Sequence, residues 1–393
     1  MAITHALTDA LRPLGSLAPG RGGPARDLNL SYNDEVKLLP SPRRSPWRWV
    51  LVVGALVAFA ALPGYLGDPG LRVLAMCGVF AIGAIGLNLL IGYTGQISLG
   101  HAFFVGVGAY TAAYFGGQRG WSMPAYLALA ALIGFVVGGV IGPFALRLRG
   151  NYLVVVTLGL VFLGEHLWNN WESVTGGGAG VSLGAAPISL GPLDFKAGLE
   201  IGDIRYSFAQ SMFWFVWALV ALAALLAKNL VRSRPGRAMQ AIRDRDLSAE
   251  VIGVSPARYK VGAFAWSSAY AAVAGALYGL LQQFVSPLDF TLFLSITYVA
   301  MIIIGGLGTI FGSIVGALFV WGGRSLIEQN SGSAVFDSLL TTGAGDSGIL
   351  TIGELNAILF GLAIVLFLLL EPRGLAAFWF RVKIWFVTWP FSY

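Results

Sequence analysis

The side chains best able to do chemistry lie in an apolar stretch between Gly86 and His101, which reads GLNLLIGYTGQISLGH. Gly92 and Gly95 interrupt this stretch. A glycine break of this kind frees backbone groups, which a membrane tolerates only where they are buried in protein or line a watery cavity. The polar side chains around the break that could line a substrate pathway are Asn88, Tyr93, Gln96, Ser98 and His101.

Two interpretations of these five polar side chains stay open. Broken helices often build transport pathways in membrane proteins. Polar residues inside spans are costly and often functional, but they also hold helices together by hydrogen bonds. The pattern therefore predicts either the lining of a pathway or a polar turn between two packed helices.

Enzymatic and metal chemistry find little support in the sequence. Glu165 and His166 form one acid–imidazole pair, next to Trp168 and Trp171. Because tryptophan belts mark membrane boundaries, we interpret this pair as an interface anchor rather than an active site. Three histidines and one cysteine, Cys77, leave no His-cluster metal site and no disulfide. Since no nucleophile–base constellation occurs either, we expect a chain that is not an enzyme and binds no cofactor.

The sequence also lacks an ATP site of the P-loop kind. No lysine follows a glycine anywhere in the chain, so the Walker A pattern Gly-x-x-x-x-Gly-Lys is absent. No apolar span carries an unambiguous Asp or Glu relay of the kind that proton- and sodium-coupled carriers often use. Active transport by this chain is therefore expected to use ATP hydrolysed by a separate ATPase.

A charged island at 230–260 supports that expectation. It holds seven Lys/Arg and three acids. The pattern predicts a helix from Arg237 to Glu250, which Gly253 ends. A small apolar face on this helix, with its charged rim, suits docking into a groove on a partner protein, and an ordinary solvated loop is the alternative. The small face consists of Ala238, Ala241, Ile242 and Ala249.

Composition places the chain in a membrane. Hydrophobic residues make up 56% of it and charged residues 11%, against about 25% charged residues in soluble domains. A helix needs about 20 apolar residues to cross a bilayer, and the apolar runs do not alternate as barrel strands do. We therefore predict an all-α integral membrane protein with about ten transmembrane helices, some of them broken. The predicted spans are 47–67, 71–91, 97–116, 122–146, 151–168, 208–229, 261–284, 290–305, 308–327 and 354–371.

Loops and tails define the predicted organisation. Residues 1–46 form a flexible N-terminal tail, 47–371 the transmembrane domain, and 372–393 an amphipathic aromatic and basic C-terminal tail. Ten spans that start inside place both tails and the 230–260 island in the cytoplasm, where Lys and Arg are enriched. The net charge of +6 lies in these segments, so it indicates membrane orientation and not nucleic-acid binding.

One apolar region is too short for two regular spans. Its 34 residues, 290–323, would extend about 51 Å as a helix. Because Gly305–Gly308 interrupts the region, two short or broken helices fit better than one long span. Glycines spaced four apart, such as Gly275 and Gly279, predict close packing of helices in lipid.

Five blocks of distinctive sequence cover most of 86–318. They are GLNLLIGYTGQISLGHAFFVGVGAY (86–110), RLRGNYLVVVTLGL (147–160), NNWESVTGGGAGV (169–181), PGRAMQAIRDRDLSAEVIGVSPARYKVGAFAWSSAYAAVAGALYG (235–279) and FVSPLDFTLFLSITYVAMIIIGGLGTIFGSIVGAL (284–318). These blocks resemble the permeases of branched-chain amino-acid ABC transporters of the LivM type, a family of high-affinity hydrophobic amino-acid uptake. The C-terminal segment 371–393 looks like a subgroup of the same permeases.

The resemblance implies an importer of the bacterial inner (plasma) membrane. In such systems a second homologous permease completes the pore, two cytoplasmic ATPases hydrolyse ATP, and a periplasmic binding protein delivers branched-chain or other hydrophobic amino acids. The cytoplasmic loop between spans couples these permeases to the ATPase. The matching residues of this chain are Gly236, Arg237, Ala238, Ala241, Ile242, Arg243, Asp244, Asp246, Ala249 and Gly253.

Other functions remain as alternatives. Related urea permeases share much of the pattern, although they tend to carry Arg in place of Leu307. A permease for urea, amides or another small organic solute is therefore the alternative within the class. A carrier or channel that works alone on an ion gradient comes from a different class, and a membrane enzyme ranks third. Because the binding protein sets much of the selectivity in these systems, the substrate stays open.

Overall fold

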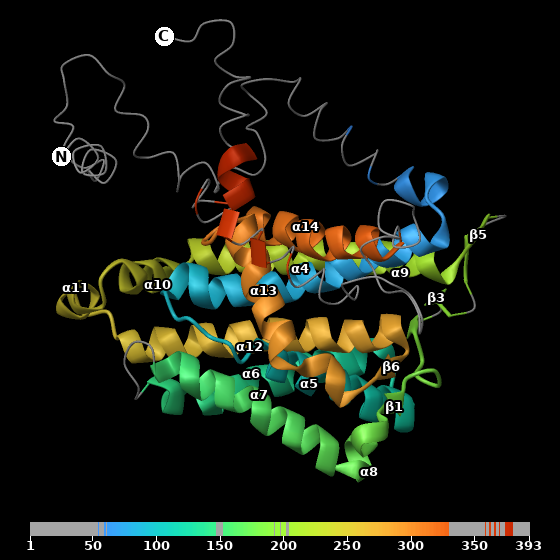
Figure 1. The fold of residues 1–393 in the computed structure, drawn as a ribbon, viewed down its shortest axis with the longest axis horizontal. Helices are drawn as coiled ribbons and strands as arrows, with labels where there is room; N and C mark the ends of the chain where they lie inside the picture. The colour runs from blue at the N-terminus through green and yellow to red at the C-terminus, as the bar shows by residue number, and fades with distance from the viewer. Residues whose placement is uncertain are drawn as a thin grey trace, which may run out of the picture. The chain divides into compact units, whose positions relative to one another are not determined.

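The structure, a computed structural model, describes residues 61–146, 152–191, 193–196, 198–201, 204–329 and 374–379, with isolated positions at 54, 59 and between 358 and 369. The elements discussed below lie in one unit of the chain, Val57–Tyr393. Helices run side by side in this unit between two ends of different character (Figure 1). One end carries α10 (Arg234–Asp244) and α11 (Asp246–Val251) and is named the α10–α11 end; the other carries short strands and is named the hairpin end.

Two long helices, α4 (Asp68–Thr94) and α12 (Pro256–Gln282), form the centre of the bundle. In their most apolar windows 89% and 78% of the residues are buried. The corresponding fractions are 22%, 28% and 22% in α6 (Met123–Leu146), α7 (Tyr152–Asn170) and α9 (Phe208–Arg232). The outer helices therefore present much of their apolar surface to whatever surrounds the chain, as lipid-facing helices do.

Local sequence sets the ends of these helices. Pro69 lies in the first turn of α4, where a missing N–H costs no hydrogen bond. At the other end Gly95 takes the left-handed conformation (φ 71°), and the N–H groups of Gly95 and Gln96 donate back to carbonyls of the last turn. Ser207 and Gln210 form a capping box that starts α9, with bonds of 3.2 and 2.9 Å.

Glycines bring α12 into close contact with α5 (His101–Thr111). A Cβ added to Gly275 would collide with the Val105 carbonyl, and one added to Gly108 would collide with the Ala272 carbonyl. The backbones of the two helices thus touch, which confirms the close packing predicted from the glycine spacing at Gly275. Beyond α5 the chain continues as a π-helix, η1 (Ala112–Gln118).

The region 290–323 folds back on itself. It forms α13 (Leu292–Gly305) and α14 (Ile310–Gln329), which are bent by 119° across a short break. Gly306 (φ 123°) and Gly308 (φ 78°) supply the backbone conformations of that break. Gly316 lies directly against the Met301 carbonyl and so lets α14 pack closely on α13. The prediction of two short or broken helices is confirmed.

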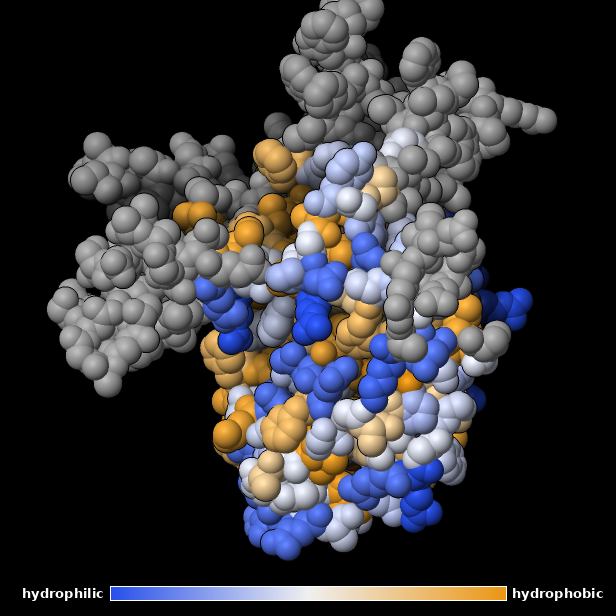
Figure 2. Space-filling model, turned by 90° about the vertical axis from the view of Figure 1, so that its right-hand side faces the viewer, coloured by the Kyte–Doolittle hydropathy of each residue, from blue (hydrophilic) through white to orange (hydrophobic). Residues whose placement is uncertain are grey.

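Short strands gather at the hairpin end. β1 (Val181–Ser182) pairs with β6 (Phe284–Val285), β2 (Ser189–Leu190) with β3 (Leu193–Asp194), and β4 (Leu199–Ile201) with β5 (Ile204–Tyr206), all antiparallel. The short elements α8 (Glu172–Thr175), η2 (Gly177–Ala179) and η3 (Pro287–Phe290) complete this end. Figure 2 shows hydrophilic residues spread over it. Two of these pairs lie within the loop between α7 and α9, and β1–β6 joins that loop to the segment after α12. The described fold is therefore mostly helical, as predicted, with short strands outside the helices.

Eight of the predicted spans coincide with described helices. The predictions between 71 and 168 correspond to α4, α5 with η1, α6 and α7, and those between 208 and 327 to α9, α12, α13 and α14. Among the described residues five helices are long and apolar enough to cross a membrane, or six if the bent α13–α14 pair is one span. The count of about ten is therefore not confirmed. The predicted spans 47–67 and 354–371 lie largely outside the described residues.

Candidate functional site

The charged island folds into two helices rather than one. Arg245 separates α10 from α11 with an extended backbone (φ −157°, ψ 106°), which corrects the single helix predicted for 237–250. The Arg245 N–H closes α10 on the Ala241 carbonyl, and the Arg245 carbonyl accepts a bond from the Ala249 N–H, each at 3.1 Å. Gly253 follows α11 with φ 85°, so it ends the helical segment as predicted.

The small apolar face of these helices points into the chain's own bundle. Ala238, Ile242 and Ala249 are buried, and Ala241 is half-buried. Gly236 lies in the first turn of α10 and packs against carbonyls at the end of α9. A short apolar face is buried by the nearest apolar surface, which here belongs to α4, α9 and α12. In this chain its own helices therefore cover the face, and a contact of these residues with a partner protein stays a prediction.

The opposite side of the island carries charges and large apolar side chains. Asp244 and Asp246 are exposed. Leu247, Val251 and Ile252 are 79%, 87% and 74% exposed, which is unusual for apolar residues of this size. Sequence analysis missed these three, although Leu247 and Val251 have the i, i+4 spacing of one helix face. We name them the α11 ridge.

Arg243 reaches from α10 to two glycine turns. Its Nη1 donates to the Gly92 carbonyl at 2.6 Å, in the last turn of α4. The same Nη1 lies beside the break between α13 and α14, since a Cβ added to Gly308 would be 2.9 Å from it. Carbonyls at a helix C-terminus carry partial negative charge, so a guanidinium stabilises this end of α4. Arg237, also exposed, donates instead to the Arg232 carbonyl at 3.2 Å.

Asn88 joins α4 to the same break. Its Nδ2 donates to the Thr309 carbonyl and to the Ser313 hydroxyl, both at 2.8 Å. Its Oδ1 accepts from the Gly308 N–H at 2.9 Å. The side chain is 1% exposed. Among the described residues Asn88 therefore acts as a hydrogen-bonded link between α4 and the start of α14.

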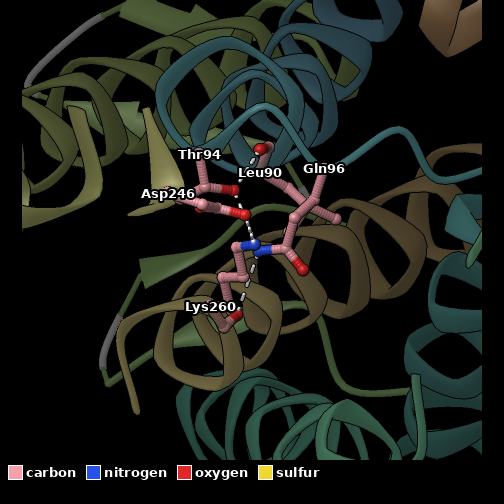
Figure 3. A network of polar contacts seen from close by, with 5 residues as sticks. All are labelled: Leu90, Thr94, Gln96, Asp246 and Lys260. Atoms are coloured by element: carbon pink, nitrogen blue, oxygen red, sulfur yellow. Dashed lines mark hydrogen bonds and ion pairs between the residues drawn. The ribbon is translucent and has the colours of Figure 1, made fainter. Parts of the chain in front are cut away.

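Gln96 connects the end of α4 to α11 through α12 (Figure 3). Its Nε2 donates to the Thr94 hydroxyl at 2.9 Å and to the Lys260 carbonyl at 3.3 Å. Thr94 in turn donates to the Leu90 carbonyl at 2.5 Å. Lys260 Nζ forms an ion pair with the Asp246 carboxylate at 2.5 Å. The Gln96 Oε1 is buried and has no hydrogen-bond partner in the described part of the chain.

The remaining predicted pathway residues are also buried in this chain. Tyr93, Ser98 and His101 are 5%, 3% and 3% exposed. His101 Nε2 lies 2.9 Å from the Gly83 carbonyl, and Ser98 Oγ accepts from the Gly100 N–H at 3.3 Å. Gln96 therefore lies at the first glycine break, whereas Asn88 bonds to the second break and His101 contacts α4 about three turns before Gly95. Their role in a pathway stays a prediction.

A segment near the C-terminus meets the second glycine break. Gly374 has φ 72°, and a Cβ added to it would lie 2.6 Å from the Gly306 nitrogen. Ala376 is buried, and Leu375 packs against the core. The sequence offered no signal for this contact beyond the glycine itself, because it joins residues that are far apart in the chain.

The pair Glu165 and His166 forms no active site with other described residues. Asn169 donates to the Glu165 carbonyl at 2.8 Å, and Asn170 donates to the His166 carbonyl at 2.8 Å. These are bonds within the last turns of α7, next to the buried Trp168. In the described ranges no group of three or more His, Cys, Asp or Glu residues could hold a metal ion.

Comparison with known proteins identifies the family. The family model described as branched-chain amino acid transport system / permease component matches residues 71–370. The permease protein LivM of the high-affinity branched-chain amino acid transport system of Salmonella typhimurium is 32% identical, over 74% of this chain and 72% of its own.

Two further relatives have the same general role. The LivM protein of Escherichia coli is 31% identical over 71% of this chain and 68% of its own. The autoinducer 2 import system permease protein LsrC of Salmonella paratyphi B is 27% identical over 68% of this chain and 74% of its own. No solved structure matches the chain. The chain belongs to the family of permease components of branched-chain amino acid transport systems, and as such it is a multi-pass inner-membrane permease subunit of an ABC importer, a complex with ATPase and binding-protein partners.

Proposed function

We propose that this chain moves branched-chain or other hydrophobic amino acids across the bacterial inner membrane. The two LivM relatives, at 31% and 32% identity, are named for high-affinity branched-chain amino acid transport, which supports this substrate class. The relative named for autoinducer 2 import is 27% identical, so it gives weaker support to the alternative of another small organic solute. Urea and amides belong to that alternative.

The proposed complex contains a second homologous permease, two ATPase subunits and a periplasmic binding protein. In this arrangement the α10–α11 end and both chain termini face the cytoplasm, and the hairpin end faces the periplasm. The basic character of the 230–260 island supports this orientation, because Lys and Arg are enriched on the cytoplasmic side. We expect the periplasmic binding protein to contact the hairpin end, where Figure 2 shows hydrophilic residues among apolar ones.

The α11 ridge is the observation that carries the proposed contact with the ATPase. Its three side chains, Leu247, Val251 and Ile252, are exposed beside the charged Asp244 and Asp246. Apolar residues this exposed on a charged, water-facing segment mark a protein contact. The ridge replaces the small buried face as the docking surface. Movement of the ATPase dimer on binding ATP would then reach the permease through α11.

The proposed substrate pathway passes the first glycine break. The five buried polar residues are spread along the second half of α4 and the turn before α5, from the contact of His101 with Gly83 to Gln96. Backbone and side chains of this kind at membrane depth are found where a helix is buried in protein or lines a solute path. The path would be completed by the second permease, which faces one side of this region in the proposed complex.

The test of the proposed function uses the reconstituted complex. Leu247→Ser combined with Val251→Ser removes most of the ridge, and buried interface residues of this kind contribute about 1–2 kcal/mol each, so affinity for the ATPase should fall by about 30-fold or more. Co-purification of the ATPase and ATP-dependent uptake of leucine are measured together. The matched control is Leu288→Ser, which changes a residue 81% exposed at the opposite, hairpin end and should leave co-purification of the ATPase unchanged.

Three results would contradict the proposal in different ways. Normal association and uptake in the double variant would remove the ridge from the ATPase interface. Uptake by this chain alone in liposomes without ATP would instead favour a carrier that works on an ion gradient. Uptake of urea but not of leucine by the full complex would overturn the substrate class.

A further inference from the structure

Three segments that are far apart in the sequence meet at one side chain, Arg243. It extends from α10, donates to the Gly92 carbonyl at the end of α4 and lies beside Gly308 between α13 and α14. Gly95, whose left-handed conformation ends α4, lies close as well: a Cβ added to it would be 3.7 Å from the Arg243 side chain. The guanidinium is thus shared by the island and both glycine breaks.

The two breaks are also joined to each other. Asn88 accepts a bond from the Gly308 N–H and donates to the Thr309 carbonyl, so the second break is held against α4. On the other side Gln96 donates to the Lys260 carbonyl, and the Lys260 ammonium pairs with Asp246 of α11. A displacement of α10 and α11 must therefore either carry the ends of α4 and α13 with it or break these bonds.

The chemistry of Arg243 suits a link of this kind. A guanidinium presents its N–H donors in a fixed planar fork. Its hydrogen bond ends on a helix C-terminal carbonyl, which attracts positive charge. Gly92 cannot take a side chain, because a Cβ there would meet Asn88 and the Gly308 backbone. The guanidinium therefore contacts the backbone directly, with no other side chain between them.

We propose that Arg243 is a positioning residue that transmits movement of α10 and α11 to the two glycine breaks, and that it does so from inside the permease rather than by touching the ATPase. This inference rests on the proposed function, because it assumes that the ATPase moves the island. The breaks at Gly95 and Gly308 are the points where α4 and the α13–α14 pair can change direction. Arg243 makes the two changes occur together.

The test compares arginines of one helix in the reconstituted complex. Arg243→Gln removes the charge and most donors, Arg243→Lys keeps the charge without the planar fork of donors, and Arg234→Gln, at an exposed position of the same helix, is the matched control. Leucine uptake and ATP hydrolysis are measured in the same vesicles. Because coupling between sites typically amounts to 5–150-fold, Arg243→Gln should lower the leucine transported per ATP by about tenfold, and Arg243→Lys by about threefold.

Assembly and hydrolysis distinguish this inference from the proposed function. We expect the ATPase to co-purify with Arg243→Gln and to keep its hydrolysis rate, and Arg234→Gln to behave like the wild type. A parallel loss of uptake and hydrolysis would show that Arg243 serves docking or folding and would overturn the inference. An unchanged ratio would overturn it too. Failure of the wild-type chain to bind an ATPase would instead overturn the proposed function.

A distance measurement tests the inference without changing Arg243. Cys77 is the only cysteine, so spin labels at Ile97 and Ser248 can be introduced after Cys77→Ala. Ile97 follows the first break and Ser248 lies on α11, and both are exposed. If Arg243 transmits the movement, the distance between the labels stays the same when the complex binds ATP. A change in this distance in the otherwise native complex would mean that α11 moves independently of the break.

Discussion

Replacement of Asn88 by Leu should lower the stability of the permease, and the size of the loss follows from the hydrogen bonds of Asn88. Leu keeps the branched shape but removes three bonds, to Thr309, Ser313 and Gly308. The Ser313 hydroxyl still donates to the Thr309 carbonyl at 3.2 Å, so these two groups can satisfy each other. The Gly308 N–H, in a half-buried turn, is left without its acceptor.

The expected cost follows from these losses. An orphaned buried N–H costs about 1–3 kcal/mol, and hydrogen bonds between membrane helices contribute about 0.6 kcal/mol each. Asn88→Leu should therefore destabilise the permease by about 2–3 kcal/mol. Thr297→Val is the matched control, since Thr297 is similarly buried and donates only within its helix, to the Phe293 carbonyl at 2.8 Å. That change should cost less than about 1 kcal/mol.

The assay is thermal unfolding of the purified complex in detergent, followed by tryptophan fluorescence. Asn88→Leu should lower Tm by about 5 °C, and Thr297→Val by about 1 °C. Equal Tm values for the two variants would refute the assignment of Asn88 as a link between α4 and the second break. An unchanged Tm with a raised KM for leucine would go further, because it would place Asn88 on the substrate pathway.

Two more predictions concern packing and charge. Gly275→Ala should destabilise the chain by about 2–3 kcal/mol, because its Cβ would meet the Val105 carbonyl. Gly262→Ala, on the same helix with open space around it, should instead stabilise the chain by up to about 1 kcal/mol. Tm measurements on both variants check this, and equal shifts in Tm would contradict it. Asp246→Asn should lower the free energy of unfolding by less than about 1 kcal/mol, because Asp246 is 51% exposed. The loss of stability should be smaller still in 1 M salt, which screens the ion pair with Lys260. A large loss that salt does not change would contradict this.

Much of the helical framework could be predicted because its signals are local. Apolar length located α4, α9 and α12, and the glycine, serine and proline positions at their ends agree with the observed caps. Ser255 and Pro256 start α12 where the sequence indicates a new element. Gly305–Gly308 interrupts the apolar region where the structure bends. Each of these features depends on residues within about one helical turn.

The orientation of the island could not be predicted in the same way. Both sides of α10 and α11 carry apolar residues, small ones such as Ala238 and large ones such as Leu247. Alanine and Gly236 allow the helix backbone to approach α9 and α4 closely, so the small side is buried and the large side is left exposed. The choice depends on surfaces contributed by other helices. Arg243 and Arg237 likewise look equivalent in the sequence, although Arg243 contacts a carbonyl 151 residues away.

The polar residues of the first break differ in how free they are to bind a solute. Asn88 has its amide nitrogen and oxygen engaged by α14 and the turn before it, so a solute would have to compete with three existing bonds. Gln96 has a buried amide oxygen without a partner among the described residues. A buried polar atom with no partner carries a free-energy penalty of about 1–3 kcal/mol, which a donor from a passing solute would relieve. An ammonium group is such a donor. The two interpretations of the break are therefore compatible: Asn88 holds the turn in place, and a contact of Gln96 with the solute stays a prediction that Gln96→Leu would test, since it should raise the KM for leucine more than it lowers Tm.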